Sequence, residues 1–190
     1  MLLKIHQVGS PVLREPAPAL APDDLRTREI QDLITAMRAT MRDAPGVGLA
    51  APQVGQALRL AVIEVREEYL SRLPPEEVAA RGMVPVPFHV IVNPELVVED
   101  PATERFFEGC LSLAGFGASV PRARAVRVNA LDAGGQPIEV RAQAWYARIL
   151  QHEIDHLAGT LYLDRMDSRS FASRENYERY AGGRSSGRET

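Results

Sequence analysis

The sequence AQAWYARILQHEIDHLAG, residues 142–159, contains the element that decides the fold. Its residues recur at spacings of three and four, which puts one set of side chains on a single helical face: Ala142, Trp145, Ile149, His152 and His156. We expect the helix to cover about 141–158 and to end at Gly159. Because the rest of this face is apolar, both histidines are expected to point toward the core.

The stretch His152-Glu153-Ile154-Asp155-His156 within this helix is an H-E-x-x-H motif. Histidines four residues apart lie one helical turn apart, so both can reach one metal ion, and the adjacent glutamate lies beside bound water without being a ligand. So short a motif also occurs by chance, as two core or solvent-facing histidines. Burying two unpartnered imidazoles is costly, however, and a metal ion relieves that cost.

A metal site of this kind needs a third protein ligand, and the residues leave two candidates. Glu175 has the downstream position that the simplest zinc peptidases use, although it lies in a polar stretch. Cys110, in Glu108-Gly109-Cys110-Leu111-Ser112, offers a thiolate, although a free cysteine is more often a small buried side chain. One cysteine and two histidines would leave the fourth coordination position open for water, as catalysis requires.

The remaining sequence predicts an α+β domain of mostly antiparallel strands around this central helix, with an N-terminal and a C-terminal helix. We expect an amphipathic helix over 23–43, strands over 58–65, 88–98 and 160–163, and a hairpin joining 124–131 to 138–140. The proline-rich stretches 1–22 and 66–87 should be irregular, the second as a loop insertion.

The C-terminal part is expected to be the least ordered. Residues 167–180 predict a weak, solvated helix and 182–190 a disordered tail. We therefore expect a catalytic domain over 1–166, followed by a C-terminal helix and flexible tail over 167–190.

Composition narrows the class of protein. The chain has 190 residues, a net charge of −3 and no long basic stretch, so a nucleic-acid-binding surface is not indicated. The single cysteine excludes an intrachain disulfide and fits a reducing compartment. No apolar run resembles a signal peptide or a membrane span, so we expect a soluble cytoplasmic protein without a membrane partner.

Three motifs, in this order, resemble the peptide deformylase family: GVGLAAPQ at 46–53, EGCLS at 108–112 and QHEIDH at 151–156. The similarity extends over about 1–166. The resemblance implies a metal-dependent hydrolase that removes the N-formyl group from the starting methionine of nascent proteins and releases formate. Formyl-methionyl nascent peptides would then be its partners, and the ribosome is a further candidate.

The resemblance also implies a role for each motif. Cys110, His152 and His156 would hold the ion, and Glu153 would act as general base and then general acid. The Gln53 side-chain amide and the Leu111 backbone N–H would stabilise the oxyanion. The ion would be Fe(II) in the native enzyme, with zinc, nickel or cobalt as replacements; ligand chemistry alone suggests zinc.

Substrate contacts are expected from two groups of residues. The resemblance implies that Val47 and Gly48 present backbone groups to a peptide bound as an added strand. Glu108 and Gly109 are expected to line the same site, with an exposed acid or a residue that orients nearby backbone as the alternatives for Glu108. The methionine pocket is expected from apolar residues near the ligands, with ordinary core packing as the alternative: Phe106, Trp145 and Ile149. Asp155 faces away from the metal by helix geometry and should form a salt bridge with Arg122.

The sequence departs from the family at one position that bears on substrate binding. Many bacterial members have an arginine seven residues after the cysteine, whereas this chain has Gly117. Two other functions stay open at this point: a zinc peptidase that uses Glu175, and a metal-stabilised binding module without activity. Gln53 also has an alternative role, as a surface loop residue.

Overall fold

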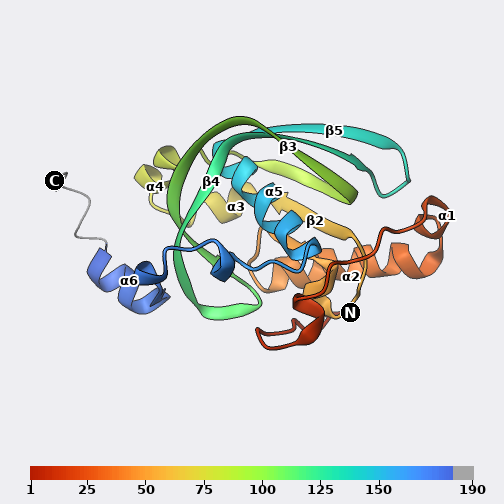
Figure 1. Cartoon of the computed structure of the whole chain (residues 1–190), viewed down its shortest axis with the longest axis horizontal. Helices are drawn as coiled ribbons and strands as arrows, with labels where there is room; N and C mark the ends of the chain where they lie inside the picture. Colours follow the sequence, from red (N-terminus) through yellow and green to blue (C-terminus); the bar gives the residue numbers. More distant parts are fainter. Residues whose placement is uncertain (182–190) are drawn as a thin grey trace.

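The computed structural model describes residues 1–181. The helix α5, Ala144–Leu157, lies at its centre, and an antiparallel sheet curves around it (Figure 1). The sheet has six strands in the order β1-β2-β3-β4-β5, with β6 paired to β4. All strand pairings within the described residues are antiparallel. The predicted α+β class is therefore confirmed.

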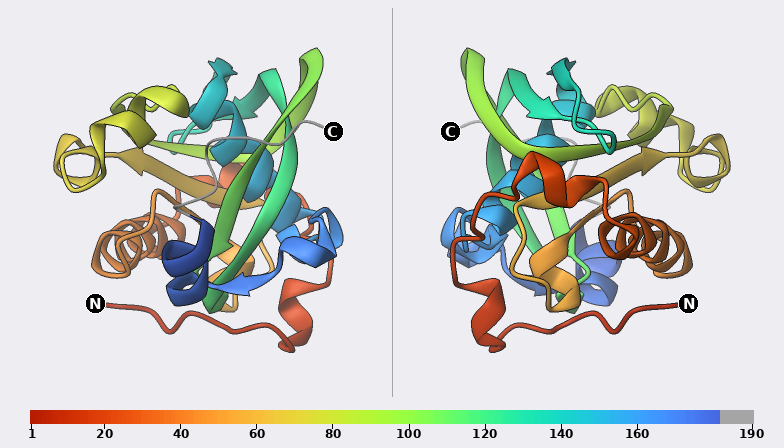
Figure 2. Two further views of the ribbon diagram at one scale, coloured as in Figure 1. Left: turned by 90° about the vertical axis from the view of Figure 1, so that its left-hand side faces the viewer. Right: turned by 90° about the vertical axis from the view of Figure 1, so that its right-hand side faces the viewer.

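Two long strands bring distant parts of the chain to α5. β3 spans Val86–Cys110 and β4 spans Leu113–Leu131, and this hairpin arches around the helix (Figures 1 and 2). Register shifts along β3 are bulges, which bend a strand and increase its twist. The shorter strands are β1 Gly48–Ala50, β2 Leu60–Val65, β5 Pro137–Gln143 and β6 Ala172–Ser173.

The strand predicted over 88–98 is part of the longer strand β3, which continues through Asn93-Pro94 by forming a bulge. Asn93 has a φ of 49°, and the pairing of β3 with β4 shifts between Val92 and Glu95. The Asn93 side chain accepts a hydrogen bond from the Leu20 N–H at 2.9 Å and donates one to the Leu20 carbonyl at 2.8 Å. The bulge therefore ties the N-terminal segment to the sheet.

The central helix begins three residues later than its apolar periodicity predicts. Residues 141–143 belong to β5, where Ala142 pairs with Val126 of β4. Ala144 turns the chain from strand to helix with a φ of 52°, a left-handed conformation that few non-glycine residues adopt. Ala147, Ile149, Leu150 and Leu157 then pack into the core formed with β2, β3 and β4. The helix is thus held on its buried face by the sheet.

The N-terminal helical region is two helices instead of one. α1 covers Pro22–Leu25 and α2 covers Arg28–Asp43, with Thr27 in an extended conformation between them. The predicted apolar stripe is buried in a second core cluster with β1 and β2, through Ile30, Ile34, Met37 and Met41. The helix was correctly located, and its start was placed too early.

Segment 66–87 was predicted as an irregular loop, but it contains two short helices. α3 covers Glu67–Leu70 and α4 covers Pro75–Ala80. Acidic residues in the first turn of each helix, such as Glu67 and Glu76, favour helical structure by facing unpaired backbone N–H groups. Both helices lie beside the end of α5 from which the chain enters it (Figure 1).

Residues 160–163 do not form the predicted strand. They enter a 3₁₀ turn, η3, at Tyr162–Asp164, because the Asp164 carboxylate accepts the Leu161 N–H at 2.8 Å. Where one weak helix was predicted over 167–180, the structure has three elements: a 3₁₀ turn at Ser168–Ser170, strand β6, and helix α6 at Arg174–Ala181. The predicted disorder over 182–190 lies outside the described residues.

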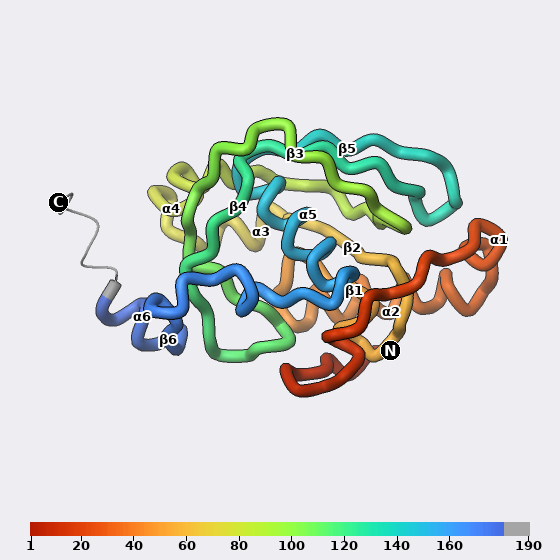
Figure 3. The backbone as a smooth tube through the Cα atoms, viewed as in Figure 1, coloured from red at the N-terminus to blue at the C-terminus, as the bar shows by residue number. Residues whose placement is uncertain are grey.

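Residues 1–21 form no α-helix or strand, as predicted, and follow the outside of the fold (Figure 3). They contain one 3₁₀ turn, η1, at Pro11–Leu13. Backbone hydrogen bonds join the His6 N–H to the Gln53 carbonyl and the Val8 N–H to the Ser112 carbonyl, both at 2.8 Å. This segment therefore connects two of the motif loops. None of the helices in the described part of the chain is long and apolar enough to span a membrane.

Candidate metal centre

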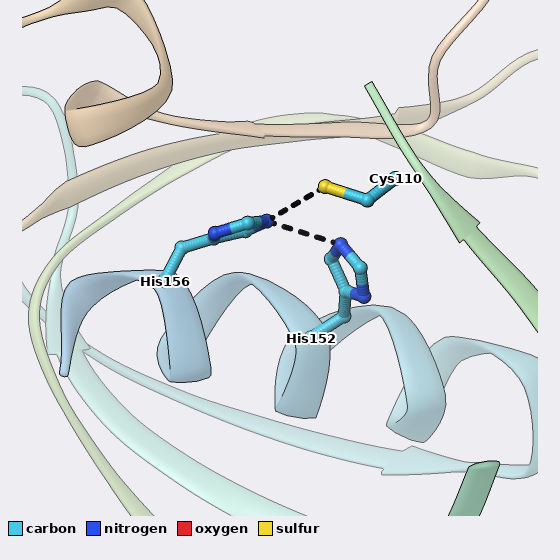
Figure 4. Close-up of side chains that lie close together, drawn as sticks. All are labelled: Cys110, His152 and His156. Carbon is cyan, nitrogen blue, oxygen red and sulfur yellow. Dashed lines mark hydrogen bonds between the residues drawn. The ribbon is translucent and has the colours of Figure 1, made fainter. Parts of the chain in front are cut away.

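Three donor atoms converge between α5 and the end of β3. Cys110 is the last residue of β3, and His152 and His156 lie one turn apart on α5 (Figure 4). His156 Nε2 lies 3.2 Å from Cys110 Sγ and 3.2 Å from His152 Nε2. The three ligand atoms all lie within 4.8 Å of one another. The structure thus brings together the three residues that the sequence assigned to a metal.

This donor set fits a divalent transition-metal ion. With bonds of about 2.1 Å to nitrogen and about 2.3 Å to sulfur, tetrahedral ligands lie about 3.4–3.6 Å apart, close to the separations seen here. His156 is almost fully buried, and its Nε2 faces another imidazole nitrogen, so an ion between them would supply a partner for both. Three protein ligands leave a fourth coordination position for water.

Glu175, the alternative third ligand, is not near these atoms. It lies on α6 with 77% of its side chain exposed, and it forms an ion pair with Arg179 at 2.9 Å. The metal-ligand group found among residues 1–181 contains Cys110 instead. This geometry argues against the zinc peptidase alternative.

The buried carboxylate of Glu108 orients one ligand. Glu108 Oε1 lies 2.6 Å from His152 Nδ1, and its two oxygens also accept hydrogen bonds from Arg122 and Arg148. Burial alone would raise the pKa of Glu108, but its hydrogen bond and charge interaction with His152, and those with Arg122, lower it. An ionised Glu108 accepts a hydrogen bond from the Nδ1–H of His152, which leaves the unprotonated Nε2 free to bind metal.

The sequence suggested that Glu108 could touch substrate, orient backbone or be exposed. The structure shows it 6% exposed, with its carboxylate engaged by His152 and two arginines. Arg148 was missed by the sequence reasoning. It lies four residues before His152 on α5 and therefore on the same helical face, which is the signal in the sequence that could have identified it.

The predicted salt bridge between Asp155 and Arg122 is present, at 2.5 Å. Arg165 also binds the Asp155 carboxylate, with two hydrogen bonds of 2.6 Å. Arg122 is 4% exposed and joins Asp155 to Glu108. The ion-pair network therefore fixes α5 against β3 and β4 from behind the ligands.

Glu153 lies beside the ligands in a space that only glycine leaves free. A Cβ atom on Gly48 would lie 2.2 Å from Glu153 Oε1 and 2.6 Å from its Cδ. Burial is the main cause that raises the pKa of Glu153 to about 7. Its Oε2 has no hydrogen-bond partner within residues 1–181. The carboxyl group is thus fixed by packing and retains a free oxygen.

Gln53 is buried, which excludes the surface-loop alternative; its exposed fraction is 1%. It lies in the 3₁₀ turn η2, Ala51–Val54, where its Oε1 accepts the Ala50 N–H at 2.8 Å. The amide nitrogen then points toward Cys110 Sγ at 3.5 Å and Ser112 Oγ at 3.2 Å. Leu111 follows Cys110 in the turn between β3 and β4, so both expected oxyanion donors lie next to the cysteine.

A cleft of about 520 Å³ opens onto these groups. Its lining includes most of the expected substrate-contact residues: Val47, Gly48, Glu108, Gly109, Trp145 and Ile149. Phe106 is absent from the lining and Phe107 is present, because neighbouring residues of a strand point to opposite faces. Phe106 instead packs against the guanidinium groups of Arg81 and Arg148, each 5.3 Å from its ring centre. The expected place of Phe106 in the methionine pocket is therefore corrected.

The cleft has two further walls that sequence reasoning did not predict. One comes from the 66–87 segment, through Tyr69, Leu73, Glu77 and Arg81. The other comes from α6, through Arg174, Tyr177 and Glu178. The C-terminal helix is therefore not simply a solvated element.

Comparison with known proteins identifies the family of this chain. A sequence model of the family described as polypeptide deformylase matches residues 2–172. Peptide deformylase 1A of tomato chloroplasts is 47% identical over 174 residues, which are 92% of this chain and 63% of the tomato protein. The chain thus spans less than two thirds of that relative. Peptide deformylase 3 of Streptomyces avermitilis is 48% identical over 177 residues, 91% of this chain and 75% of the relative.

A solved structure shows the same fold. The class I type b peptide deformylase of Acinetobacter baumannii, bound to Met-Ala-Ser, superposes with a TM-score of 0.77 at 31% identity. The match covers 87% of this chain and 99% of that one. Because the family sequence model matches nearly the whole described chain, and relatives of known name match at nearly half identity, the chain belongs to the polypeptide deformylase family.

Proposed function

We propose that this protein hydrolyses the N-formyl group of formyl-methionyl peptides and releases formate. The observation that carries the proposal is the convergence of Cys110, His152 and His156 beside the buried carboxyl group of Glu153. When bound there, a divalent ion would lower the pKa of a water ligand to about 7 and polarise the formyl carbonyl. We propose Fe(II) as the native ion, with zinc, nickel and cobalt as replacements.

Glu153 supplies the proton transfers in this proposal. Its free Oε2 takes a proton from the attacking water and delivers it to the amine of the departing methionine. Burial raises its pKa to about 7, close to the pH at which a group that both accepts and donates a proton works best. Gly48 leaves room for the carboxyl group, because any side chain at that position would overlap it.

The Gln53 amide and the Leu111 N–H are assigned to the developing negative charge on the formyl oxygen. The Ala50 N–H holds Gln53 Oε1, so the amide N–H₂ is turned toward the cysteine before substrate arrives. A donor fixed in advance needs no reorganisation during the reaction, and losing such a donor typically costs about 100-fold or more in rate.

The peptide is proposed to bind as an added strand at β1, near Val47 and Gly48. β1 is the terminal strand in the sheet order, so one of its edges has no neighbouring strand among residues 1–181. Gly109 lines the same cleft, and Trp145 and Ile149 are proposed to contact the methionine side chain. The Acinetobacter relative is bound to Met-Ala-Ser, the peptide that removal of a formyl group from formyl-Met-Ala-Ser would leave, which supports formyl-methionyl peptides as the substrate class.

We further propose that residues 1–166 form the catalytic domain and that 167–190 form a C-terminal helix and tail. Nascent peptides are the proposed partners, with the ribosome as a candidate docking site, and the cytoplasm is the proposed location. The reducing compartment that a lone cysteine favours supports this location.

The test is formate release from formyl-Met-Ala by iron-loaded, anaerobically prepared protein, with and without a chelator. We expect Glu153→Gln to lose about 100-fold or more in kcat while it retains one metal ion per chain. Glu29→Gln, an exposed acid at the start of α2, is the matched control and should behave as wild type. No formate from the metal-loaded protein would overturn the proposal, and full activity in Glu153→Gln would overturn the role of Glu153.

A further inference from the structure

The chain after residue 166 returns to the cleft and forms part of its wall. β6 pairs with β4 through Phe116 with Ser173 and Gly117 with Ala172, and α6 begins at the next residue, Arg174. α6 therefore starts beside the tip of the β3–β4 hairpin, where the ligand Cys110 ends β3 (Figures 1 and 2).

Two aromatic stacks fix this segment in position. The rings of Phe107 and Tyr177 stack with centroids 3.6 Å apart and planes 13° apart. The rings of Phe116 and Phe171 stack with centroids 5.3 Å apart. Such pairs contribute beyond the apolar area that they bury, so they hold the start of α6 against the hairpin.

Gly117 makes the first stack possible. A Cβ atom at residue 117 would lie 2.4 Å from the Phe107 ring and 2.7 Å from the Glu108 carbonyl oxygen. Any side chain at this position would therefore displace Phe107 and break its stack with Tyr177. In this chain the absence of a side chain at 117 allows α6 to dock.

Docking of α6 delivers an arginine to the cleft. Arg174 lines the cleft, and its Nη2 lies 4.0 Å from the position of a Cβ atom on Gly109, the residue before the ligand Cys110. Its charge is available, since Arg81 and Arg148 are paired with Glu77 and Glu108, whereas no carboxylate in residues 1–181 forms an ion pair with Arg174.

We propose that Arg174 binds a carboxylate of the substrate peptide on the C-terminal side of the formyl-methionine. A guanidinium group offers parallel N–H donors that match a carboxylate. The carboxylate has two sources: an aspartate or glutamate side chain in a nascent chain, or the terminal carboxylate of a short peptide. Arg174 is thus a specificity-determining residue, and its assignment rests on the deformylase activity proposed above.

The test compares KM values for matched substrates. The side-chain arm uses the amides of formyl-Met-Asp-Ala and formyl-Met-Ala-Asp against the corresponding asparagine peptides. The chain-end arm uses formyl-Met-Ala-Ala with a free carboxylate against its amide. For wild type we expect KM to be about two- to five-fold lower for the charged member of at least one pair, as for a partly exposed ion pair. High salt should reduce the difference.

Arg174→Ala should remove this preference, and Arg174→Lys should restore part of it, because lysine keeps the charge without the planar fork. Arg179→Ala is the matched control: it removes an arginine from the same helix that is paired with Glu175 and does not line the cleft. It should keep the wild-type preference. Calorimetric binding of the product peptides Met-Ala-Asp amide and Met-Ala-Asn amide gives a second readout that does not depend on turnover.

The outcomes separate the two proposals. Wild type that releases formate but shows no preference for a carboxylate, or an Arg174→Ala variant that retains the preference, would overturn the role of Arg174 alone. Wild type that releases no formate from any substrate would overturn the deformylase activity itself. A preference lost in both Arg174→Ala and Arg179→Ala would also refute the proposal, since it would reflect the general charge of α6 instead of one residue.

Discussion

A single added methyl group at Gly48 should disable the proposed general base without removing the metal. The Cβ atom of Gly48→Ala would lie 2.2 Å, 2.6 Å and 2.8 Å from Oε1, Cδ and Cγ of Glu153. Ordinary van der Waals contacts begin at about 3.4 Å, so the carboxyl group must move by about 1 Å. Gly48 belongs to a completely buried strand and Glu153 to a packed helix, so the side chain of Glu153 is the part most able to shift.

A displacement of about 1 Å at a reacting group can cost about 100-fold in rate. We therefore expect Gly48→Ala to lower kcat for formyl-Met-Ala by about 100-fold, with one metal ion still bound per chain. Steady-state formate release gives kcat, elemental analysis gives the metal content, and thermal melting followed by circular dichroism reports whether the variant folds.

Gly134→Ala is the matched control. Residue 134 lies in the exposed turn between β4 and β5, where a Cβ atom would have its nearest neighbour, the Asp132 carboxylate, at 3.3 Å. This variant should keep wild-type kcat. If folded, metal-loaded Gly48→Ala retained kcat within about twofold of wild type, the placement of Glu153 by Gly48 would have no part in the reaction, and the argument above would fail.

Three further changes test other parts of the structure. Glu108→Gln should weaken metal binding by about 10- to 100-fold in chelator competition, because His152 loses the carboxylate that orients it; unchanged affinity would contradict this. Gln53→Ala should reduce kcat by about 100-fold with little change in metal content, and an unchanged kcat would exclude the amide as an oxyanion donor. Glu64→Gln should destabilise the fold by about 1 kcal/mol near pH 7, measured by urea unfolding, through loss of the Arg42 ion pair. Hydrogen bonding to Arg42 lowers the pKa of Glu64 in the folded state, so the stabilisation by Glu64 is present at neutral pH and is lost as the pH falls through that lowered pKa. The difference in unfolding free energy between wild type and Glu64→Gln should therefore disappear in acid. A difference that does not change with pH would contradict this.

The parts of the site that the sequence predicted follow from local periodicity. The spacing of His152 and His156 can be read from one helix, and their apolar neighbours Trp145 and Ile149 show which face is buried. The same reasoning located α2 and the hairpin of β4 and β5. It placed the start of α5 too early, because strand pairing of Ala142 with Val126 outweighs the helical pattern of residues 141–143.

Features that depend on strand bends and long-range packing have no signal in the sequence comparable to this helical spacing. Whether Phe106 or Phe107 reaches the cleft depends on the register of β3, and several bulges reset that register before residue 103. A slip of one residue exchanges the two faces of a strand, so the wrong phenylalanine was assigned to the pocket. The contact of α6 with the cleft depends on a ring at 107, a missing side chain at 117 and a tyrosine at 177, three positions that no short motif connects.

The same contrast between local periodicity and long-range packing explains how the metal centre is built. The two histidines are placed by one rigid helix, whereas Cys110 must be brought to them by a strand of 25 residues. Pairing with β4 holds this strand along its length, but the ligands also require the hairpin to be fixed relative to α5. Arg122 supplies the restraint: it extends from β4, pairs with Glu108 two residues before Cys110, and pairs with Asp155 next to His156. Because Glu108 also binds His152, a single connected set of charges fixes the cysteine and both histidines relative to one another. The buried ion pairs are therefore best understood as determinants of ligand geometry, since a buried pair by itself contributes little net stability.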